Sequence, residues 1–227
     1  MKKIRILAIC FEQQILPKDL PKFRGAIIKK TGQKSILFHN HIGDDKLRYR
    51  YPLIQYKVIG KQGCLLCIDE GTEEIHSLLG MRNMDILIGD QPVSLSIDSL
   101  TAKNFQLGIS DDMHHFSIRN WLALNEVNFQ KYMSLRSLTD RVAFLERILT
   151  GNIISFAKGV GYTVEDTINL TIDHISDEKR VPYKGNLLTA FDLDFTVNIC
   201  LPDYIGLGKG VSIGFGMVKH FGKSTKQ

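Results

Sequence analysis

The order of strand-like and helix-like segments is the feature that most limits how this chain can fold. In the first half, a strand-like segment is followed by a helix-like one, two strands, a second helix and a further strand. In the second half, a helix-rich block precedes several strands. Mixed segments of this length and order favour an α+β fold, built from two split βαβ units.

Local signals give the expected bounds of these elements. Residues 3–11 predict a strand, and Pro17 and Pro21 bracket a turn that leads into a basic helix over roughly 21–31, which Gly32 ends. The other elements expected in the first half are strands at 53–59 and 64–69 joined by a hairpin at 60–63, a helix at 70–81, and strands at 84–88 and 93–109. From about Met113 we expect helices at 125–135 and 137–158, strands at 163–175 and 187–201, a glycine-rich segment at 206–216 and a short final strand.

Length and composition place the chain among globular proteins. Its 227 residues are 44% hydrophobic and 23% charged, which excludes disordered and collagen-like classes. This length suits one large domain or two small ones. No apolar run is long enough to span a membrane. The basic and then apolar start lacks a signal-peptide cleavage pattern, so we expect a first strand and a cytoplasmic protein.

The four cysteines do not make a disulfide framework in a chain of this length. Cys64 and Cys67 form a lone CxxC, and no second CxxC or CxxH completes a zinc site. On a strand, an offset of three residues places the two sulfurs on opposite faces. The sequence therefore favours two small buried hydrophobic residues, with a redox or metal role as the alternative.

Positive charge is concentrated in one part of the chain. The formal net charge is +5, but residues 17–61 carry eleven basic and three acidic residues, which makes that segment +8. Such a field attracts polyanions such as nucleic acids. The alternative is an ordinary solvated lysine face. The basic residues are Lys18, Lys22, Arg24, Lys29, Lys30, Lys34, Lys46, Arg48, Arg50, Lys57 and Lys61.

The segment 206–216 has five glycines in eleven residues. It is not a Walker A loop, and it fails the GxGxxG dinucleotide pattern at Val211. Glycines let a backbone approach phosphates and offer N–H groups to them, and Lys209 adds a positive charge. The segment therefore favours contact with a polyanion backbone, with a flexible surface turn as the alternative.

His39 and His41 flank Asn40 within the basic segment. Histidine titrates near neutrality, so two of them can take and give protons in one reaction. Cleavage of an RNA phosphodiester needs a base for the 2′-OH, an acid for the 5′-oxygen and a cation for the phosphorane, which Lys30 or Lys34 can supply. Two ordinary surface histidines are the alternative, and a metal site is weakly supported because a third ligand is lacking beyond residues 44–45.

Tyr49 and Tyr51 alternate with Arg48 and Arg50. Aromatic and guanidinium groups interleaved in this way can stack on bases and hold phosphates. The alternative is an edge strand whose tyrosines pack inward while its arginines face solvent.

Four stretches together resemble the CRISPR-associated repeat-RNA endoribonuclease family of the RAMP superfamily. The first is the glycine-rich segment, which ends in Gly214-Phe215-Gly216. The others are FRGAIIKK at 23–30, HNH at 39–41 followed by YRYPLIQYK at 49–57, and WLALN at 121–125. The resemblance spans nearly the whole chain.

The resemblance implies two tandem ferredoxin-like (RRM-like) domains. We expect an N-terminal domain at 1–112, with the basic segment and the histidine pair, and a C-terminal domain at 113–227, with the glycine-rich loop. It also implies a metal-independent endoribonuclease without a cofactor. Such an enzyme cuts the repeat in the CRISPR precursor transcript and leaves a 2′,3′-cyclic phosphate or 3′-phosphate and a 5′-OH.

The resemblance also assigns roles to residues. It maps the catalytic set onto His39, His41, Lys30 and Tyr49, and leaves open which histidine is the acid. The residues expected to bind RNA are Arg24, Lys29, Arg48, Arg50, Gly206, Gly208, Lys209, Gly210 and Gly214. The expected partner is repeat RNA, as a single strand or hairpin, together with other CRISPR effector subunits and without a membrane. Monomer and homodimer remain open.

Two other functions fit parts of the sequence. A binding module with the same fold would hold repeat RNA without cutting it, and it would never produce a cyclic phosphate end. A small-molecule enzyme would show a nucleotide fingerprint or paired acids in a pocket. Asp192 and Asp194 share a strand face, but we expect them on the solvent side of Leu193, Phe195 and Val197.

Overall fold

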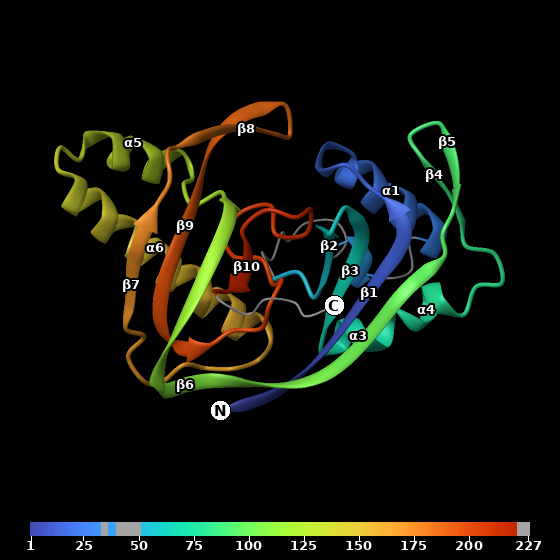
Figure 1. Ribbon diagram of the computed structural model, residues 1–227, viewed down its shortest axis with the longest axis horizontal. Helices are drawn as coiled ribbons and strands as arrows, with labels where there is room; N and C mark the ends of the chain where they lie inside the picture. Colours follow the sequence, from blue (N-terminus) through green and yellow to red (C-terminus); the bar gives the residue numbers. More distant parts are fainter. Residues whose placement is uncertain (33–35, 40–50, 222–227) are drawn as a thin grey trace. The chain divides into compact units, whose positions relative to one another are not determined.

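The computed structural model describes residues 1–32, 36–39 and 51–221. The chain divides into two compact units. The N-terminal unit comprises Lys3–Phe105 with Ser212–Gly214, and the C-terminal unit comprises Met1–Lys2, Gln106–Val211 and the chain from Phe215 onward. Strand β6 (Ile97–Trp121) runs through the point of division without a break, so it supplies a strand to both units (Figure 1).

The N-terminal unit is a four-stranded sheet with helices between its strands. Its strands follow the order β2-β3-β1-β6, and β3 is antiparallel to both β1 and β2. In chain order its elements are β1 (Lys2–Gln14), η1 (Pro17–Asp19), α1 (Leu20–Thr31), α2 (Ile36–His39), β2 (Ile54–Ile59), β3 (Gln62–Ile68), α3 (Glu70–Glu74), α4 (His76–Leu79), β4 (Asp85–Ile88), β5 (Gln91–Ser94) and the start of β6. This βαββαβ order with β1 and β3 in the middle is the ferredoxin-like arrangement.

Helix α1 forms as the sequence predicts. Pro21 occupies its first turn, where the missing N–H costs nothing. Phe23 and Ile27 lie one turn apart and are fully buried in the core of the unit. The helix ends at Gly32, whose φ of 77° only glycine adopts readily and whose N–H donates to the Ile28 carbonyl.

The hairpin between β2 and β3 is also confirmed. Gly60 and Lys61 have φ angles of 57° and 74°, so both central residues of the turn are left-handed. A two-residue turn of this kind matches the twist of antiparallel strands. The two strands pair from Ile54 with Cys67 to Ile59 with Gln62.

The predicted single helix over 70–81 is wrong. Two short helices, α3 and α4, meet at Ile75 instead. Ile75 and Leu78 are both fully buried. The first turn of α3 packs closely against the backbone at Leu53. A Cβ on Gly71 would lie only 2.6 Å from the Leu53 carbonyl oxygen. Tertiary packing therefore overrides helix propensity here.

The C-terminal unit repeats the same strand order. Its strands follow β10-β6-β9-β7, and β8 forms a hairpin with β9. After β6 come α5 (Glu126–Ser134), α6 (Leu138–Gly159), β7 (Leu170–Ile175), β8 (Lys179–Tyr183), β9 (Asn186–Cys200) and β10 (Met217–His220). The glycine-rich segment occupies the place of the second helix between β9 and β10. The two units thus confirm the tandem ferredoxin-like fold.

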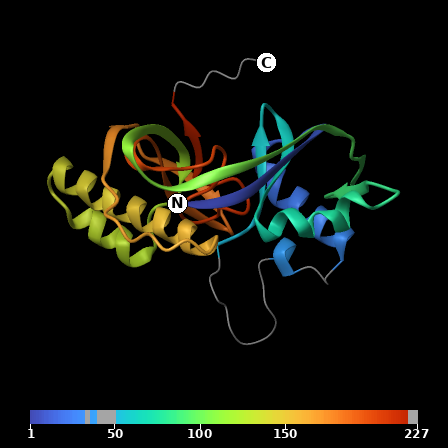
Figure 2. The ribbon, with the colours of Figure 1, turned by 90° about the horizontal axis from the view of Figure 1, so that it is seen from below.

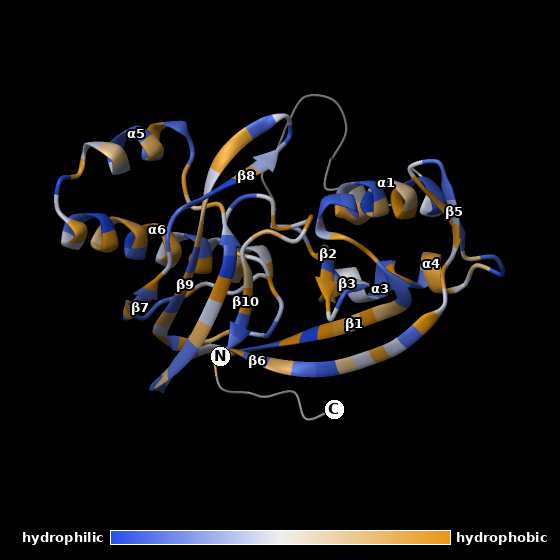
Figure 3. Cartoon of the chain, turned by 45° about the horizontal axis from the view of Figure 1, so that its top comes forward, coloured by the Kyte–Doolittle hydropathy of each residue, from blue (hydrophilic) through white to orange (hydrophobic). Residues whose placement is uncertain are grey.

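Helices α5 and α6 lie on one side of the strands of the C-terminal unit (Figures 1 and 2). Asn125 and Ser137 cap them, each accepting a hydrogen bond from the backbone N–H three residues later. Leu145 and Leu149, which lie about one turn apart on α6, are fully buried. Hydrophobic and hydrophilic residues alternate along β6 (Figure 3). No helix in the described ranges is long and apolar enough to cross a membrane.

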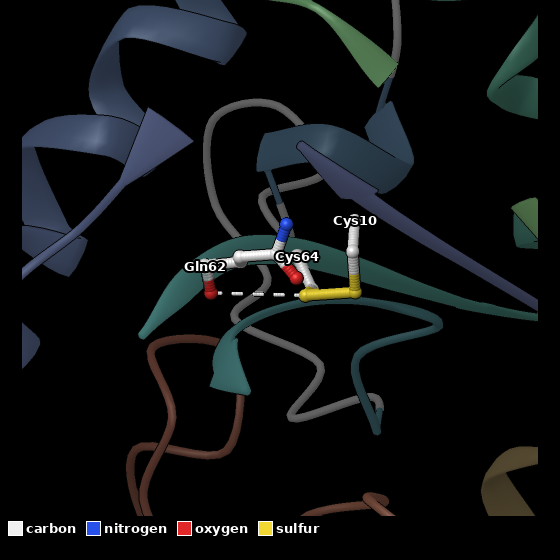
Figure 4. Close-up of a disulfide and its surroundings, with 3 residues drawn as sticks. All are labelled: Cys10, Gln62 and Cys64. Atoms are coloured by element: carbon white, nitrogen blue, oxygen red, sulfur yellow. Dashed lines mark hydrogen bonds between the residues drawn. A yellow bond between two sulfur atoms is a disulfide. The ribbon is translucent and has the colours of Figure 1, made fainter. Parts of the chain in front are cut away.

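The structure corrects the expectation for the cysteines. Cys64 forms a disulfide with Cys10, its direct partner on the neighbouring strand β1 (Figure 4). Cys67 is the small buried residue that was expected, and burial raises the pKa of its thiol to about 12. Sequence spacing pointed to the CxxC pair, whereas sheet register brings together two cysteines that are 54 residues apart.

Candidate nucleic-acid interface

The last turn of α1 carries two of the predicted site residues. Lys29 is exposed, whereas Lys30 is half-buried and its Nζ donates to Oδ1 of Asn83 at 3.4 Å. Hydrogen bonds with the side chains of Ser94 and Asn83 hold the pKa of Asp85 below its usual value, and the charge of Lys30 adds a smaller effect. Lys30 therefore lies on the side of α1 that packs against β4.

Arg24 is a less accessible cation than its place in the basic segment suggests. Its side chain is half-buried, and its Nε atom is completely enclosed. The guanidinium interacts electrostatically with Tyr56. Burial raises the pKa of the Tyr56 hydroxyl, and Arg24 partly offsets that increase. Arg24 thus contributes to the core as well as to the surface of α1.

His39 is the last residue of α2, and its side chain is outside the described residues. His41, Arg48, Tyr49 and Arg50 also lie outside them.

Buried residues lie on both sides of residues 39–52 in the sequence. Phe38, immediately before His39, is 1% exposed and belongs to the core of the N-terminal unit. Leu53 and Ile54 are equally buried at the start of β2. Residues 39–52 are therefore joined at each end to the same hydrophobic core.

Polar groups at the start of β2 form a defined arrangement. The Nε2 of the fully buried Gln55 donates to the Tyr51 hydroxyl at 2.8 Å and to the Pro52 carbonyl at 3.0 Å. These bonds hold the chain just after the segment that carries Tyr49. Sequence reasoning missed Gln55, and its signal was a polar residue in a strand whose first residue is apolar and buried.

Lys57 does not contribute to the surface charge that the sequence predicts for residues 17–61. It is one of the eleven basic residues of segment 17–61, but its side chain is completely buried. Burial lowers the pKa of its ammonium group to about 7. The exposed basic residues of the segment within the described ranges are Lys18, Lys22, Lys29 and Lys61.

The glycines of segment 206–216 are required for close packing. Gly216 has a φ of 61°, and a Cβ there would lie 1.9 Å from the Leu207 carbonyl oxygen. Gly208 approaches the indole of Trp121, which is held by a hydrogen bond from its Nε1 to Asn152. The alternative of a flexible surface turn does not describe this segment, because the protein itself fills the space beside these glycines.

Lys209 is the exposed cation of the glycine-rich segment. Its backbone N–H donates to the Leu122 carbonyl at 3.2 Å, which fixes the base of the side chain. Its Nζ lies 5.4 Å from the centre of the Tyr183 ring. Gly210 is half-buried and Gly206 is buried, so Lys209 is the part of this stretch most accessible to a polyanion.

The remaining part of the segment packs within the N-terminal unit. The carbonyl of Ser212 accepts a hydrogen bond from the Tyr56 N–H at 3.0 Å, and Ile213 forms a parallel bridge with Tyr56. A Cβ on Gly214 would lie 2.7 Å from the Leu20 side chain. Residues 212–214 therefore extend the edge of β2, the strand that follows the predicted histidine segment.

Other histidines are engaged in polar contacts within the C-terminal unit. His115 Nδ1 lies 2.8 Å from Oγ1 of Thr196, which donates to Asp173. His114 Nε2 lies 3.2 Å from the Cys200 sulfur. Within residues 1–32 and 51–221, no group of three or more His, Cys, Asp or Glu side chains could hold a metal ion.

Comparison with known proteins covers nearly the whole chain. The model of the Cas6b N-terminal domain matches residues 2–106, and that of the Cas6b C-terminal domain matches residues 108–221. An uncharacterised protein of Methanocaldococcus jannaschii is 39% identical over 114 residues, which are 50% of this chain and 76% of that protein.

Two solved structures are similar over almost their full length. One, described as the crystal structure of Cas6b, is 28% identical with a TM-score of 0.88 and covers 97% of this chain and 100% of its own. The other, described as a CRISPR RNA processing endoribonuclease Cas6b, is 26% identical with a TM-score of 0.74 over the same shares.

Proposed function

We propose that this chain, which belongs to the Cas6b family, is an endoribonuclease that cleaves the repeats of CRISPR precursor RNA. One observation carries the proposal: both domain models of the family match, and together they account for residues 2–106 and 108–221. The similar structure described as a CRISPR RNA processing endoribonuclease supports the activity. The exposed lysines of α1 and Lys209 suit a polyanionic substrate.

The proposed reaction is a transfer within the RNA that uses no metal. One imidazole of His39 and His41 takes the proton of the 2′-OH as the 2′-oxygen bonds to phosphorus. The bond from phosphorus to the 5′-oxygen breaks, and the other imidazolium gives that oxygen a proton. The products are a 2′,3′-cyclic phosphate and a 5′-OH. Lys30 and Tyr49 are the groups that we assign to stabilise the charged phosphorane.

Several contacts support this assignment. His39 directly follows the buried Phe38, and Tyr49 precedes a stretch held by the hydrogen bonds of Gln55. Catalytic groups next to anchored backbone are better positioned than groups far from any anchor. Lys30 belongs to the same unit. We assign Arg24, Lys29, Arg48, Arg50 and the glycine-rich segment to RNA binding.

The test uses repeat RNA from the CRISPR array of the same genome, incubated in EDTA, with analysis of the product ends. We expect cleavage to persist in EDTA and to yield a cyclic phosphate. In single-turnover assays, His39→Ala and His41→Ala should each lower the rate by about 10²–10⁴-fold while RNA binding persists, since each removes one proton-transfer group. His76→Ala is the matched control, because His76 is exposed on α4 of the same unit.

Other outcomes would contradict parts of the proposal. Undiminished cutting by the double alanine variant would reject the catalytic role of the two histidines but not the endoribonuclease activity. Loss of cutting in EDTA would favour metal catalysis. Tight binding without any cleaved product would reject the enzyme and leave the RNA-binding module.

A further inference from the structure

Cys10, Cys64 and Lys57 lie in one row across three neighbouring strands. Cys64 of β3 pairs with Cys10 of β1 on one side and with Lys57 of β2 on the other. Residues directly opposite each other in a sheet share a face. The disulfide and the lysine side chain therefore lie on the same face of the sheet of the N-terminal unit, to which all three residues belong.

The two cysteines of the disulfide differ in their exposure. Cys10 is half-buried, whereas Cys64 is only 1% exposed. Thiol–disulfide exchange begins when a thiolate attacks one sulfur of a disulfide and the other sulfur leaves. A thiol that arrives from solvent therefore reaches Cys10 first, which makes Cys64 the leaving group.

Lys57 is placed to assist that leaving group. Its side chain is completely buried, and it is the direct cross-strand partner of Cys64. An ammonium group beside a cysteine stabilises the thiolate, and a thiol with a lower pKa leaves faster. Burial lowers the pKa of the Lys57 ammonium group to about 7, so about half of these side chains still carry the proton at pH 7.

The surroundings of Cys64 also suit its reduced form. Its Sγ lies 3.7 Å from the carbonyl oxygen of Gln62 (Figure 4). The S–H group that forms on reduction can donate a hydrogen bond to this oxygen. A protonated Cys64 sulfur thus has an acceptor close by, and an ionised one has the cation of Lys57 on the neighbouring strand.

The remaining cysteine of the CxxC pair takes no part in this arrangement. Cys67 belongs to the hydrophobic core on the opposite face of the sheet. Burial raises the pKa of its thiol to about 12, so it is inert as a nucleophile. The pair that can exchange is therefore set by sheet register, and the CxxC spacing does not define it.

We propose that Cys10 and Cys64, with Lys57 beside them, form a redox-active site that exchanges with dithiol reductants. One thiolate of the dithiol attacks Sγ of Cys10, and the S–S bond breaks so that its electron pair leaves with Cys64. The second thiolate of the dithiol then attacks the mixed disulfide and releases Cys10. The protein gains two electrons, the two protons of the dithiol end on the two cysteines, and the dithiol becomes a cyclic disulfide. This activity is separate from the cleavage of RNA.

The test places the protein in mixtures of reduced and oxidised dithiothreitol at pH 7. Samples are quenched in acid, unfolded and alkylated, and mass spectrometry counts two modified thiols in the oxidised chain, Cys67 and Cys200, and four in the reduced one. Lys57→Met removes the charge and keeps a side chain of similar length. Lys3→Met is the matched control, because Lys3 is an exposed lysine on β1, the strand that carries Cys10.

We expect the disulfide to be reduced while circular dichroism shows that the protein stays folded. Lys57→Met should slow the reduction about tenfold and shift the equilibrium roughly tenfold toward the disulfide, which corresponds to about 30 mV. Lys3→Met should behave as the wild type does. Reduction only when urea unfolds the chain would overturn the proposal, and so would equal rates and equilibria in Lys57→Met and the wild type.

A second measurement does not require Lys57→Met to fold. Cys64→Ala leaves the Cys10 thiol free, and Cys10→Ala leaves the Cys64 thiol free. Both folded variants are mixed with dithiodipyridine, an aromatic disulfide, and the reaction of Cys67 and Cys200 in the oxidised wild type is subtracted. We expect the Cys10 thiol to react at least tenfold faster than the Cys64 thiol. Faster reaction of Cys64 would contradict the assignment of Cys10 as the attacked sulfur.

Discussion

At the level of single residues, the environment of a side chain decides what its type can do. Lys57 illustrates this, because complete burial lowers the pKa of its ammonium group from 10.5 to about 7. In the unfolded chain the pKa returns to about 10.4. Between these two values the unfolded state binds more protons than the folded one, so the free energy of unfolding rises with pH in that range.

We therefore predict that stability increases from pH 7 toward pH 10 by up to about 1.4 kcal/mol per pH unit through Lys57. Lys57→Met, which has a similar length and no charge, should remove this contribution. The measurement is urea unfolding of both proteins at several pH values. The difference in the free energy of unfolding between wild type and variant should change with pH above 7 and level off below pH 7. A difference that does not depend on pH would contradict the lowered pKa of the buried Lys57 ammonium group.

At the level of elements, pairing in the sheet creates interactions that local sequence does not reveal. Strands β1 and β3 place Cys10 directly opposite Cys64, with 4.1 Å between their Cα atoms. The disulfide closes a loop that contains α1, β2 and the whole segment with the predicted catalytic histidines. A cross-link over 54 positions limits the unfolded chain and so stabilises the fold.

We predict that reduction of this disulfide lowers the free energy of unfolding by about 2–4 kcal/mol. The measurement is thermal unfolding with and without a reductant. A Cys10→Ser, Cys64→Ser variant serves as the control, since its melting temperature should not respond to the reductant. An equal change in melting temperature in both proteins would show that the reductant does not act through the Cys10–Cys64 disulfide.

At the level of the whole molecule, charge decides how RNA is captured. The net charge is only +5, but Lys209, Lys184 and the exposed lysines of segment 17–61 suit phosphate contacts. Each neutralised phosphate of a single strand releases counterions and contributes about 0.7 to the salt slope. Affinity for repeat RNA should therefore depend steeply on salt, in the binding module as well as in the enzyme.

We predict that raising the salt from about 50 to 200 mM lowers the affinity for repeat RNA roughly 50-fold, as expected for about four phosphate contacts. Fluorescence anisotropy with labelled RNA measures this. The single-turnover rate at saturating enzyme should change far less, because the proposed proton transfer by His39 and His41 does not depend on released counterions. An affinity independent of salt would contradict binding through phosphates.

Two patterns that depend on near neighbours were predicted correctly. Pro21 and Gly32 placed α1, and the turn signal at 60–63 placed the β2–β3 hairpin. The candidate catalytic residues His39, His41 and Tyr49 remain predictions from the family resemblance. The burial of Lys57 could not be predicted, because it depends on which face of β2 is covered.

The sequence by itself determined the α+β class, because that follows from periodicity and turn residues within short stretches. Its motifs resembled those of one family, and that resemblance implied the two ferredoxin-like halves. Only the tertiary structure decided that Cys10 meets Cys64, that Gly216 must lie against Leu207, and that Lys184 and Lys209 share one tyrosine ring. Each of these contacts joins elements through strand register and packing, which are set by burial of the whole core and not by neighbouring residues.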